Sequence, residues 1–205
     1  MTTNSNLHIE NILEQAFHKS FGVTGIQWNL ISDAIELKQC KKGTCLRHSM
    51  QYETNINLLL KGAVGSITYK NDKMVCLDLC FVDDFFGDYA ALISGEQSSL
   101  EIRALTDCHF ISIPFEKLLL AYSTIPVIER EKIGRMSAEA LYILKHQELI
   151  ETKTLSAKER YLSLLNRKPD AFQQIPLKYV ASYLGITAES LSRIRKSISR
   201  GAFLS

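Results

Sequence analysis

The segment PLKYVASYLGITAESLSRIRKSI, at residues 176–198, restricts the fold of this chain more than any other part of the sequence. Apolar residues recur in it at helical spacing on both sides of Gly185. Ala181 is small enough for two helices to approach closely, a glycine can adopt the left-handed backbone of a tight turn, and Leu191 can pack back onto the first helix. This spacing predicts a helix-turn-helix. Four more apolar residues are expected on its buried side: Val180, Leu184, Ile186 and Ile194.

The second helix of this motif, expected over 187–199, carries hydroxyl and basic side chains on its other face. In such motifs the N-terminal half of the second helix faces base edges in the DNA major groove. An arginine there can bind guanine through two hydrogen bonds, and a glutamate can accept one from cytosine. Later basic residues suit phosphate contacts, and Thr187 suits the helix cap. The residues predicted to contact DNA are Thr187, Ala188, Glu189, Ser190, Ser192, Arg193, Arg195, Lys196 and Arg200.

Charge is divided unevenly along the chain. Residues 1–150 carry 14 Lys and Arg against 18 Asp and Glu, a net charge of −4. Residues 151–205 carry 10 against 4, a net charge of +6. A basic segment that follows an acidic body suggests a module that binds a polyanion, and with the helix-turn-helix it favours DNA. A plain three-helix interaction domain with a solvated basic face is the alternative.

Residues 38–113 have the pattern of a β-structure. Alternating or apolar runs such as NINLLLKGAVGSITY and LEIRALTDCHFISI are separated by turn signals, among them Asn71-Asp72 and Gly95-Glu96. Several short strands at this spacing predict an all-β sandwich or barrel. Within the first run, Gly62 and Gly65 suggest the bend of a hairpin.

Helices are predicted on both sides of the strands, over 7–19, 26–37, 115–122, 126–149 and 156–166, followed by the two helices of the motif at 176–184 and 187–199. The helix that begins at Pro126 has residues at about 3.5-residue spacing that would suit a coiled-coil contact between two copies. Packing against the chain's own β-domain would explain this pattern equally well. The candidate dimer seam is Ile133, Met136, Ala140, Ile143, Leu144 and Gln147.

Several protein classes receive no support from the sequence. There is no run of about 18 apolar residues and no pattern of a signal peptide, so we expect a cytoplasmic protein. The five cysteines are an odd number and are expected to be free thiols; Cys76 and Cys80 have no histidine pair to complete a zinc site, and no metal is assigned. No glycine-rich nucleotide loop or Ser/His/Asp order indicates an enzyme.

A β-rich N-terminal region, a long helix and a C-terminal helix-turn-helix resemble the CRP/FNR family of bacterial transcription regulators, over about residues 20–200. The resemblance implies an α+β chain with a cyclic-nucleotide-binding jelly roll at 1–125, a dimerisation helix at 126–150 and a DNA-binding domain at 151–205. It also implies a homodimer that binds palindromic promoter DNA, with RNA polymerase as a partner. The family's wing is expected to be truncated, because only GAFLS follows the second helix.

The stretch FFGDYAALISGEQSSLEIRAL, at 85–105, is similar to the phosphate-binding cassette of the family's cyclic-AMP receptors. That cassette has Gly-Glu for the ribose, Arg-Ser for the cyclic phosphate and a closing Arg-Ala. Here Gly87-Asp88 and Arg103-Ala104 match its two ends, whereas Ser98-Ser99 stands where Arg-Ser is expected. Without the guanidinium, a desolvated phosphate loses its charge partner.

The purine end of the cassette pocket also differs. An alignment without gaps puts Ile143 and Leu144 where the receptors offer a Thr-Ser pair, and apolar side chains cannot form those hydrogen bonds. We therefore expect a degenerate effector pocket that does not bind cyclic AMP and takes an unknown small molecule or none. A cyclic-nucleotide-responsive regulator, and a ligand-binding or interaction module without DNA binding, are the alternatives. The candidate pocket residues are Gly87, Asp88, Tyr89, Ser98, Ser99, Ile143 and Leu144.

Overall fold

The strands form two four-stranded antiparallel sheets that face each other. The computed structural model describes residues 3–167 and 174–201. The first sheet has the order β1 (Glu36–Cys40), β8 (Cys108–Pro114), β3 (Asn55–Lys61) and β6 (Phe85–Phe86). The second has the order β2 (Cys45–Arg47), β7 (Glu101–Ala104), β4 (Val64–Lys70) and β5 (Lys73–Cys80). Apolar residues from both sheets form the core between them, which confirms the predicted jelly roll: Leu59, Val64, Phe86, Ile102 and Phe110.

The predicted hairpin between β3 and β4 is wrong, because these two strands belong to different sheets. The backbone turns from one sheet into the other at Gly62, whose φ is +96°. A Cβ at this position would lie 2.5 Å from the carbonyl oxygen of Asp107, so only glycine fits. The hairpin forms one strand later, between β4 and β5, at the predicted turn Asn71-Asp72, where both residues have positive φ.

The first helix, α1 (Thr3–Phe21), covers one end of the β-roll and packs its Leu13 and Phe17 into a second core cluster. The predicted helix over 26–37 is two 3-10 turns, η1 (Trp28–Leu30) and η2 (Ser32–Ala34), before β1 begins at Glu36. These turns are held to α1 because the carboxylate of Glu14 accepts hydrogen bonds from the Trp28 indole and the Gly25 N–H.

A short helix that the sequence did not reveal, α2 (Tyr89–Ser94), follows β6. It is capped at both ends, by the Asp88 side chain at its start and by Gly95 in the left-handed conformation at its end. The helix α3 (Phe115–Tyr122) has the predicted bounds. Within the described residues no helix is long and apolar enough to cross a membrane.

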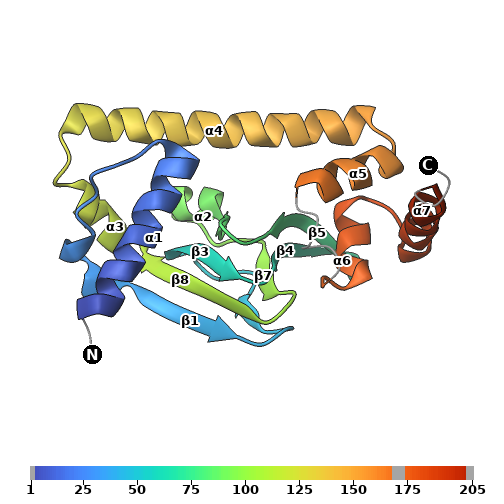
Figure 1. Ribbon diagram of the computed structural model, residues 1–205, viewed down its shortest axis with the longest axis horizontal. Helices are drawn as coiled ribbons and strands as arrows, with labels where there is room; N and C mark the ends of the chain where they lie inside the picture. The colour runs from blue at the N-terminus through green and yellow to red at the C-terminus, as the bar shows by residue number, and fades with distance from the viewer. Residues whose placement is uncertain (1–2, 168–173, 202–205) are drawn as a thin grey trace.

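The long helix α4 (Val127–Thr154) runs along the β-roll and joins it to the C-terminal helices (Figure 1). It has 28 residues and none of them is buried. Since it continues to Thr154, the expected domain boundary at 150 falls inside the helix.

Within the described residues, three helices follow α4: α5 (Ala157–Arg167), α6 (Leu177–Tyr183) and α7 (Ala188–Gly201). Ser156 and Glu159 form a capping box at the start of α5 through reciprocal hydrogen bonds. Helix α6 lies between α7 and the β4–β5 hairpin, so α7 is at the outer edge of the molecule (Figure 1). The end of the chain where a wing was considered, residues 202–205, lies outside the described residues.

Candidate functional site

The turn between α6 and α7 has the geometry that its sequence predicts. Gly185 has a φ of +66°, and the N–H of Ile186 donates a 2.9 Å hydrogen bond back to the carbonyl of Ala181. Ala181 is buried at the helix contact, and Leu191 packs from α7 into the same core with no exposed surface. The structure therefore confirms the helix-turn-helix as a folded unit.

The outer face of α7 presents Glu189, Arg193 and Lys196, which are all exposed and lie one turn apart. Thr187 caps the helix, because its hydroxyl accepts a 3.2 Å hydrogen bond from the N–H of Ser190. Hydrogen bonds from its own backbone N–H and from Thr187 lower the pKa of Glu189, so this carboxylate is ionised at neutral pH. Its charge and that of Arg193 are thus available on the same helical face.

The other residues predicted to contact DNA differ in position. Ala188, Ser190 and Ser192 are half-buried, and Arg193 donates to the Ser190 hydroxyl. Arg195 turns towards α5, where its Nε donates a 3.1 Å hydrogen bond to the hydroxyl of Tyr161 and its guanidinium lies over the ring. Arg200 belongs to α7, but its side chain lies outside the described ones.

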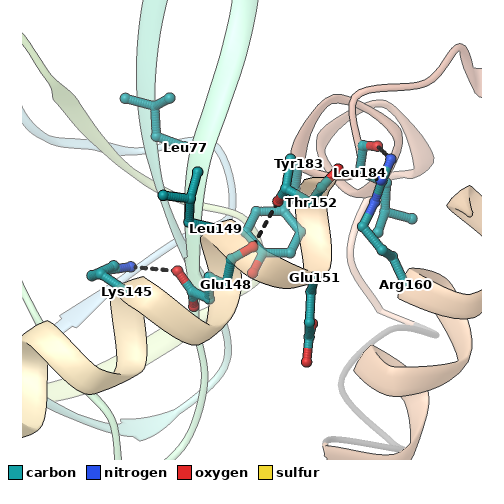
Figure 2. A pocket seen from close by; sticks show the side chains of 9 residues that line it. All are labelled: Leu77, Lys145, Glu148, Leu149, Glu151, Thr152, Arg160, Tyr183 and Leu184. Carbon is teal, nitrogen blue, oxygen red and sulfur yellow. Dashed lines mark hydrogen bonds and ion pairs between the residues drawn. The ribbon is translucent and has the colours of Figure 1, made fainter. Parts of the chain in front are cut away.

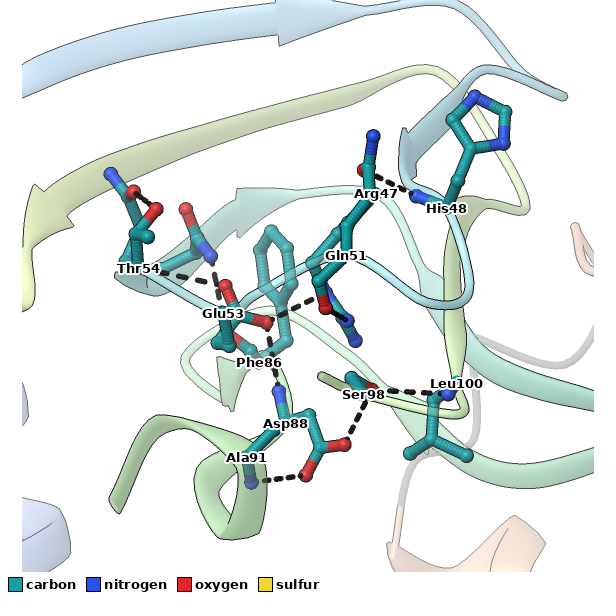
Figure 3. Close-up of polar contacts among 12 residues, drawn as sticks. Arg47, His48, Gln51, Glu53, Thr54, Phe86, Asp88, Ala91, Ser98 and Leu100 are labelled. Atoms are coloured by element: carbon teal, nitrogen blue, oxygen red, sulfur yellow. Dashed lines mark hydrogen bonds and ion pairs between the residues drawn. The ribbon is translucent and has the colours of Figure 1, made fainter. Parts of the chain in front are cut away.

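A chain of hydrogen bonds occupies the centre of the cassette-like stretch (Figure 3). The Ser98 hydroxyl donates a 2.6 Å bond to Asp88 Oδ2 and accepts one from the N–H of Leu100. The other oxygen of Asp88 accepts from the N–H of Ala91 and so caps α2. The Asp88 N–H donates to Glu53 Oε2 at 3.0 Å. Both Asp88 oxygens therefore have partners within the protein.

Glu53 also pairs with Arg47, and this pair was not found from the sequence. Arg47 Nε lies 3.0 Å from Glu53 Oε2, and both side chains are less than a tenth exposed. The two side chains form an ion pair without a hydrogen bond, because the Nε–H of Arg47 does not point at the Glu53 oxygen. Arg47 Nη1 also donates to the carbonyl of Gln51. The two charges are six residues apart across a loop, a separation that gives no periodic signal in the sequence.

A cavity of about 1070 Å³ lies between the β-roll and α4. Its walls are mainly aromatic and aliphatic, with Phe17, Phe21, Phe85, Leu118 and Tyr122 among the residues that line it. The basic side chains at its α4 wall are Arg130 and Lys145. Arg130 Nε is buried and has no hydrogen-bond partner within the described part of the chain. The cavity can therefore hold an apolar small molecule with few polar groups.

The candidate pocket residues are only partly gathered at this cavity. Gly87, Asp88 and Tyr89 line it. Ser98 is buried behind Asp88, whereas Ser99 is exposed and its carbonyl accepts from the Ser49 hydroxyl. Ile143 and Leu144 are among the exposed residues of α4 and do not line the cavity.

Two faces of α4 have different neighbours. The face towards the cavity carries Arg130, Ile133, Ser137 and Leu141. The rest of the candidate dimer seam is exposed and does not line the cavity: Met136, Ala140, Ile143, Leu144 and Gln147. Ile133 packs against the core cluster of its own chain, and the end of the Met136 side chain lies close to Gly22, where an added Cβ would be 3.3 Å from Met136 Cε.

At its C-terminal end, α4 contacts both the β-roll and the helix-turn-helix (Figure 2). Lys145 pairs with Asp78 of β5 at 2.8 Å and with Glu148 at 3.0 Å. Burial alone would lower the pKa of Lys145, but the two carboxylates raise it above its usual value. Arg160 donates to the carbonyls of Thr152 and Leu184, and so ties the ends of α4 and α6 together.

Comparisons with known proteins agree with this architecture. Residues 37–124 match the family model of the cyclic nucleotide-binding domain. No curated protein sequence matches the chain. Among solved structures, FixK2 from Bradyrhizobium japonicum is 19% identical, with a TM-score of 0.68 and coverage of 82% of this chain and 86% of that one.

Two further structures are similar. A protein from Eubacterium rectale, assigned to the CRP/FNR family of transcriptional regulators, is 18% identical with a TM-score of 0.64, and the match covers 92% of this chain and 89% of that one. The c-di-GMP-responsive regulator CLP from Xanthomonas campestris is 16% identical with a TM-score of 0.60, over 83% and 89% of the two chains. Residues 37–124 are therefore similar to a cyclic nucleotide-binding domain, and the chain has the fold seen in solved structures of CRP/FNR regulators.

Proposed function

We propose that the protein is a transcription regulator that binds promoter DNA through α7 as a homodimer, in the bacterial cytoplasm and with RNA polymerase as a partner. The observation that carries the proposal is the outer face of α7, where Glu189, Arg193 and Lys196 are exposed on a folded helix-turn-helix. This face can reach base edges and phosphates at once. Structural neighbours of the chain are regulators rather than enzymes, which supports the same function.

The second copy would pack along α4. A helix of 28 residues without one buried residue has an apolar face that its own chain leaves uncovered. The exposed residues Met136, Ala140, Ile143 and Gln147 recur at spacings of four and three, as a two-stranded coiled coil requires. A dimer of this kind would place two copies of α7 on two half-sites of a palindrome.

The effector, in this proposal, is a small molecule other than cyclic AMP. A phosphate beside Asp88 would meet two carboxylates, those of Asp88 and Glu53, and Arg47 is already paired with the second of them. The cavity beside them is mainly apolar. The c-di-GMP response of CLP supports the idea that this fold accepts effectors of different chemistry.

A gel-shift experiment with fragments of the source genome tests DNA binding directly. We expect specific retention that weakens steeply as salt rises, because phosphate contacts release counterions. The absence of retention at low salt would contradict the proposal and favour an interaction module.

A thermal-shift panel of nucleotides tests the effector separately. A large stabilisation by cyclic AMP would show that the alternative, a cyclic-nucleotide-responsive regulator, is correct.

A further inference from the structure

Three side chains with metal-binding atoms meet at the outer edge of the second sheet, and none of them lines the cavity between the β-roll and α4. They are Cys45 on β2, His48 just after it and Glu101 on β7. One ligand atom from each lies within 4.8 Å of the others. We propose that these three residues bind a divalent metal ion of the Zn²⁺ type, with water in the fourth position.

The distances suit a tetrahedral ion. Cys45 Sγ lies 3.4 Å from His48 Nδ1. A Zn–S bond of about 2.3 Å and a Zn–N bond of about 2.0–2.1 Å at a tetrahedral angle separate the two donors by roughly 3.5 Å. The sulfur and the nitrogen are therefore already placed as two ligands of one ion. A carboxylate oxygen of Glu101 lies within 4.8 Å of both of these atoms, and we assign it as the third ligand.

The chemistry of the three donors favours zinc over calcium or magnesium. Thiolate and imidazole are soft or borderline ligands, which select zinc and other transition metals, whereas calcium and magnesium prefer oxygen. Three protein ligands of mixed type leave one position open, as in zinc sites that also hold water.

The surroundings of the three residues already orient them. Arg103 Nε donates to Glu101 Oε1, and Arg103 Nη1 donates to the carbonyl of Gly43 at 2.8 Å. A ligating carboxylate is usually hydrogen-bonded in this way by a neighbouring residue. The N–H of His48 donates to the side chain of Gln51 at 3.0 Å, which fixes the start of the loop that carries the imidazole.

The site would also be linked to the cassette. The loop after His48 is joined to residue 98 by two backbone hydrogen bonds, from Met50 N to the Ser98 carbonyl at 2.7 Å and from Ser98 N to the Gln51 carbonyl at 2.9 Å. Arg47, which pairs with Glu53, stands between the two ligands Cys45 and His48. A bound ion would therefore hold the segment that supports Ser98 and Arg47.

The sequence contains a signal for this cluster that was not used. Cys45 and His48 have Cys-x2-His spacing, which is short enough for two ligands of one ion. The third ligand could not be assigned, because Glu101 reaches the other two only through the pairing of β2 with β7.

Titration of the full-length, metal-free protein with Co²⁺ and then Zn²⁺ tests the proposal. We expect about one Co²⁺ per chain, with a thiolate-to-cobalt absorption band and the visible bands of tetrahedral cobalt, displaced by Zn²⁺. Cys45→Ser should abolish the thiolate band, and His48→Ala should weaken binding at least about tenfold. Because His48 is exposed, its variant should fold normally.

Cys40→Ser is the matched control, since Cys40 is also half-buried but lies outside the cluster. It should bind Co²⁺ as the wild type does. A wild-type protein without a tetrahedral cobalt spectrum, or a Cys45→Ser variant that binds as tightly as the wild type, would overturn the proposal. The readout is metal binding alone, so it is independent of whether the protein binds DNA.

Discussion

The hydroxyl of Ser98 donates a 2.6 Å hydrogen bond to the carboxylate of Asp88, in the stretch that resembles a phosphate-binding cassette and has Ser98 in place of the expected arginine. A serine and an aspartate thus form a closed polar contact in place of a phosphate site. Three hydrogen bonds hold Asp88 in place. Its carboxylate accepts from the Ser98 hydroxyl and from the Ala91 N–H at the start of α2, and the Asp88 N–H donates to Glu53.

Ser98→Ala removes the hydroxyl, so Asp88 Oδ2 loses the hydrogen bond that Ser98 donates to it. We expect the free energy of unfolding to fall by about 1–3 kcal/mol, the cost of an unsatisfied polar group in a buried place. Ser99→Ala is the matched control, because Ser99 is the next residue and its side chain is exposed. This variant should change the free energy of unfolding by less than about 0.5 kcal/mol. Urea unfolding measures both; equal effects would mean that the Ser98–Asp88 bond contributes nothing.

Arg193→Ala should weaken binding to the preferred DNA site by about 1–3 kcal/mol per half-site and relax base choice there. Lys196→Ala should instead weaken binding to all sequences similarly and reduce the salt dependence. Lys178→Ala, on α6, is the control for loss of one positive charge. Fluorescence anisotropy across a salt series separates these cases, and identical behaviour of all three variants would argue against base contacts by α7.

Ile143→Glu places a charge on the exposed face of α4 that we assign to the dimer. We expect the dimer to dissociate into monomers with little change in the fold, because Ile143 is 55% exposed in the single chain. Tyr142→Glu is the control, since Tyr142 is 69% exposed on a different face of the same helix. Light scattering measures the mass; a wild-type monomer, or a Tyr142→Glu variant that dissociates alike, would contradict this seam.

Ser182→Ala tests the contact between α6 and the β-roll. The Ser182 hydroxyl accepts from the N–H of Cys76 at 2.9 Å and donates to the carbonyl of Met74, so it covers the edge strand β5. We expect a loss of about 1 kcal/mol in unfolding free energy. Ser197→Ala is the control, because that hydroxyl donates to the carbonyl of Ile194 in its own helix. Equal urea midpoints for the two variants would show that the contact is energetically unimportant.

Alkaline pH should destabilise the protein through the thiols of Cys76, which is buried, and Cys40, which is half-buried. Burial, followed by repulsion from Asp78, raises the pKa of Cys76 from 9.0 to about 12, and burial raises that of Cys40 to about 11. Between pH 9 and these values the unfolded thiols lose protons that the folded ones keep, so the free energy of unfolding falls as pH rises. Cys76→Ala should show a shallower fall in the free energy of unfolding, measured with urea, between about pH 9 and pH 11; an unchanged slope would contradict this assignment.

What the sequence could reveal was mostly local. The spacing of Ala181, Gly185 and Leu191 predicted the helix-turn-helix because the contacts that define this motif form between residues close in sequence. The β3–β4 hairpin failed because strand pairing depends on distant residues, here the close approach of Asp107 to Gly62. Helix α2 was missed because it has only six residues and depends on its caps.

The effector pocket could be predicted only in part, for a related reason. Gly87 and Asp88 follow a local motif and do line the cavity. Ile143 and Leu144 were placed by counting along α4, but which face of a helix meets the β-roll is decided by packing. Ser137 and Leu141 follow Ile133 at four-residue spacing, and these residues line the cavity instead of Ile143 and Leu144.

Affinity selection of genomic DNA by the purified protein, followed by sequencing and run in parallel with Arg193→Ala, tests the proposed dimeric regulator most directly. We expect enrichment of one short inverted repeat with half-sites about one helical turn, or 10 base pairs, apart, because a dimer formed through α4 would present two copies of α7. Arg193→Ala should lose that enrichment. If the wild type enriches no sequence over the variant, or only an unpaired half-site, the proposed dimeric regulator is contradicted.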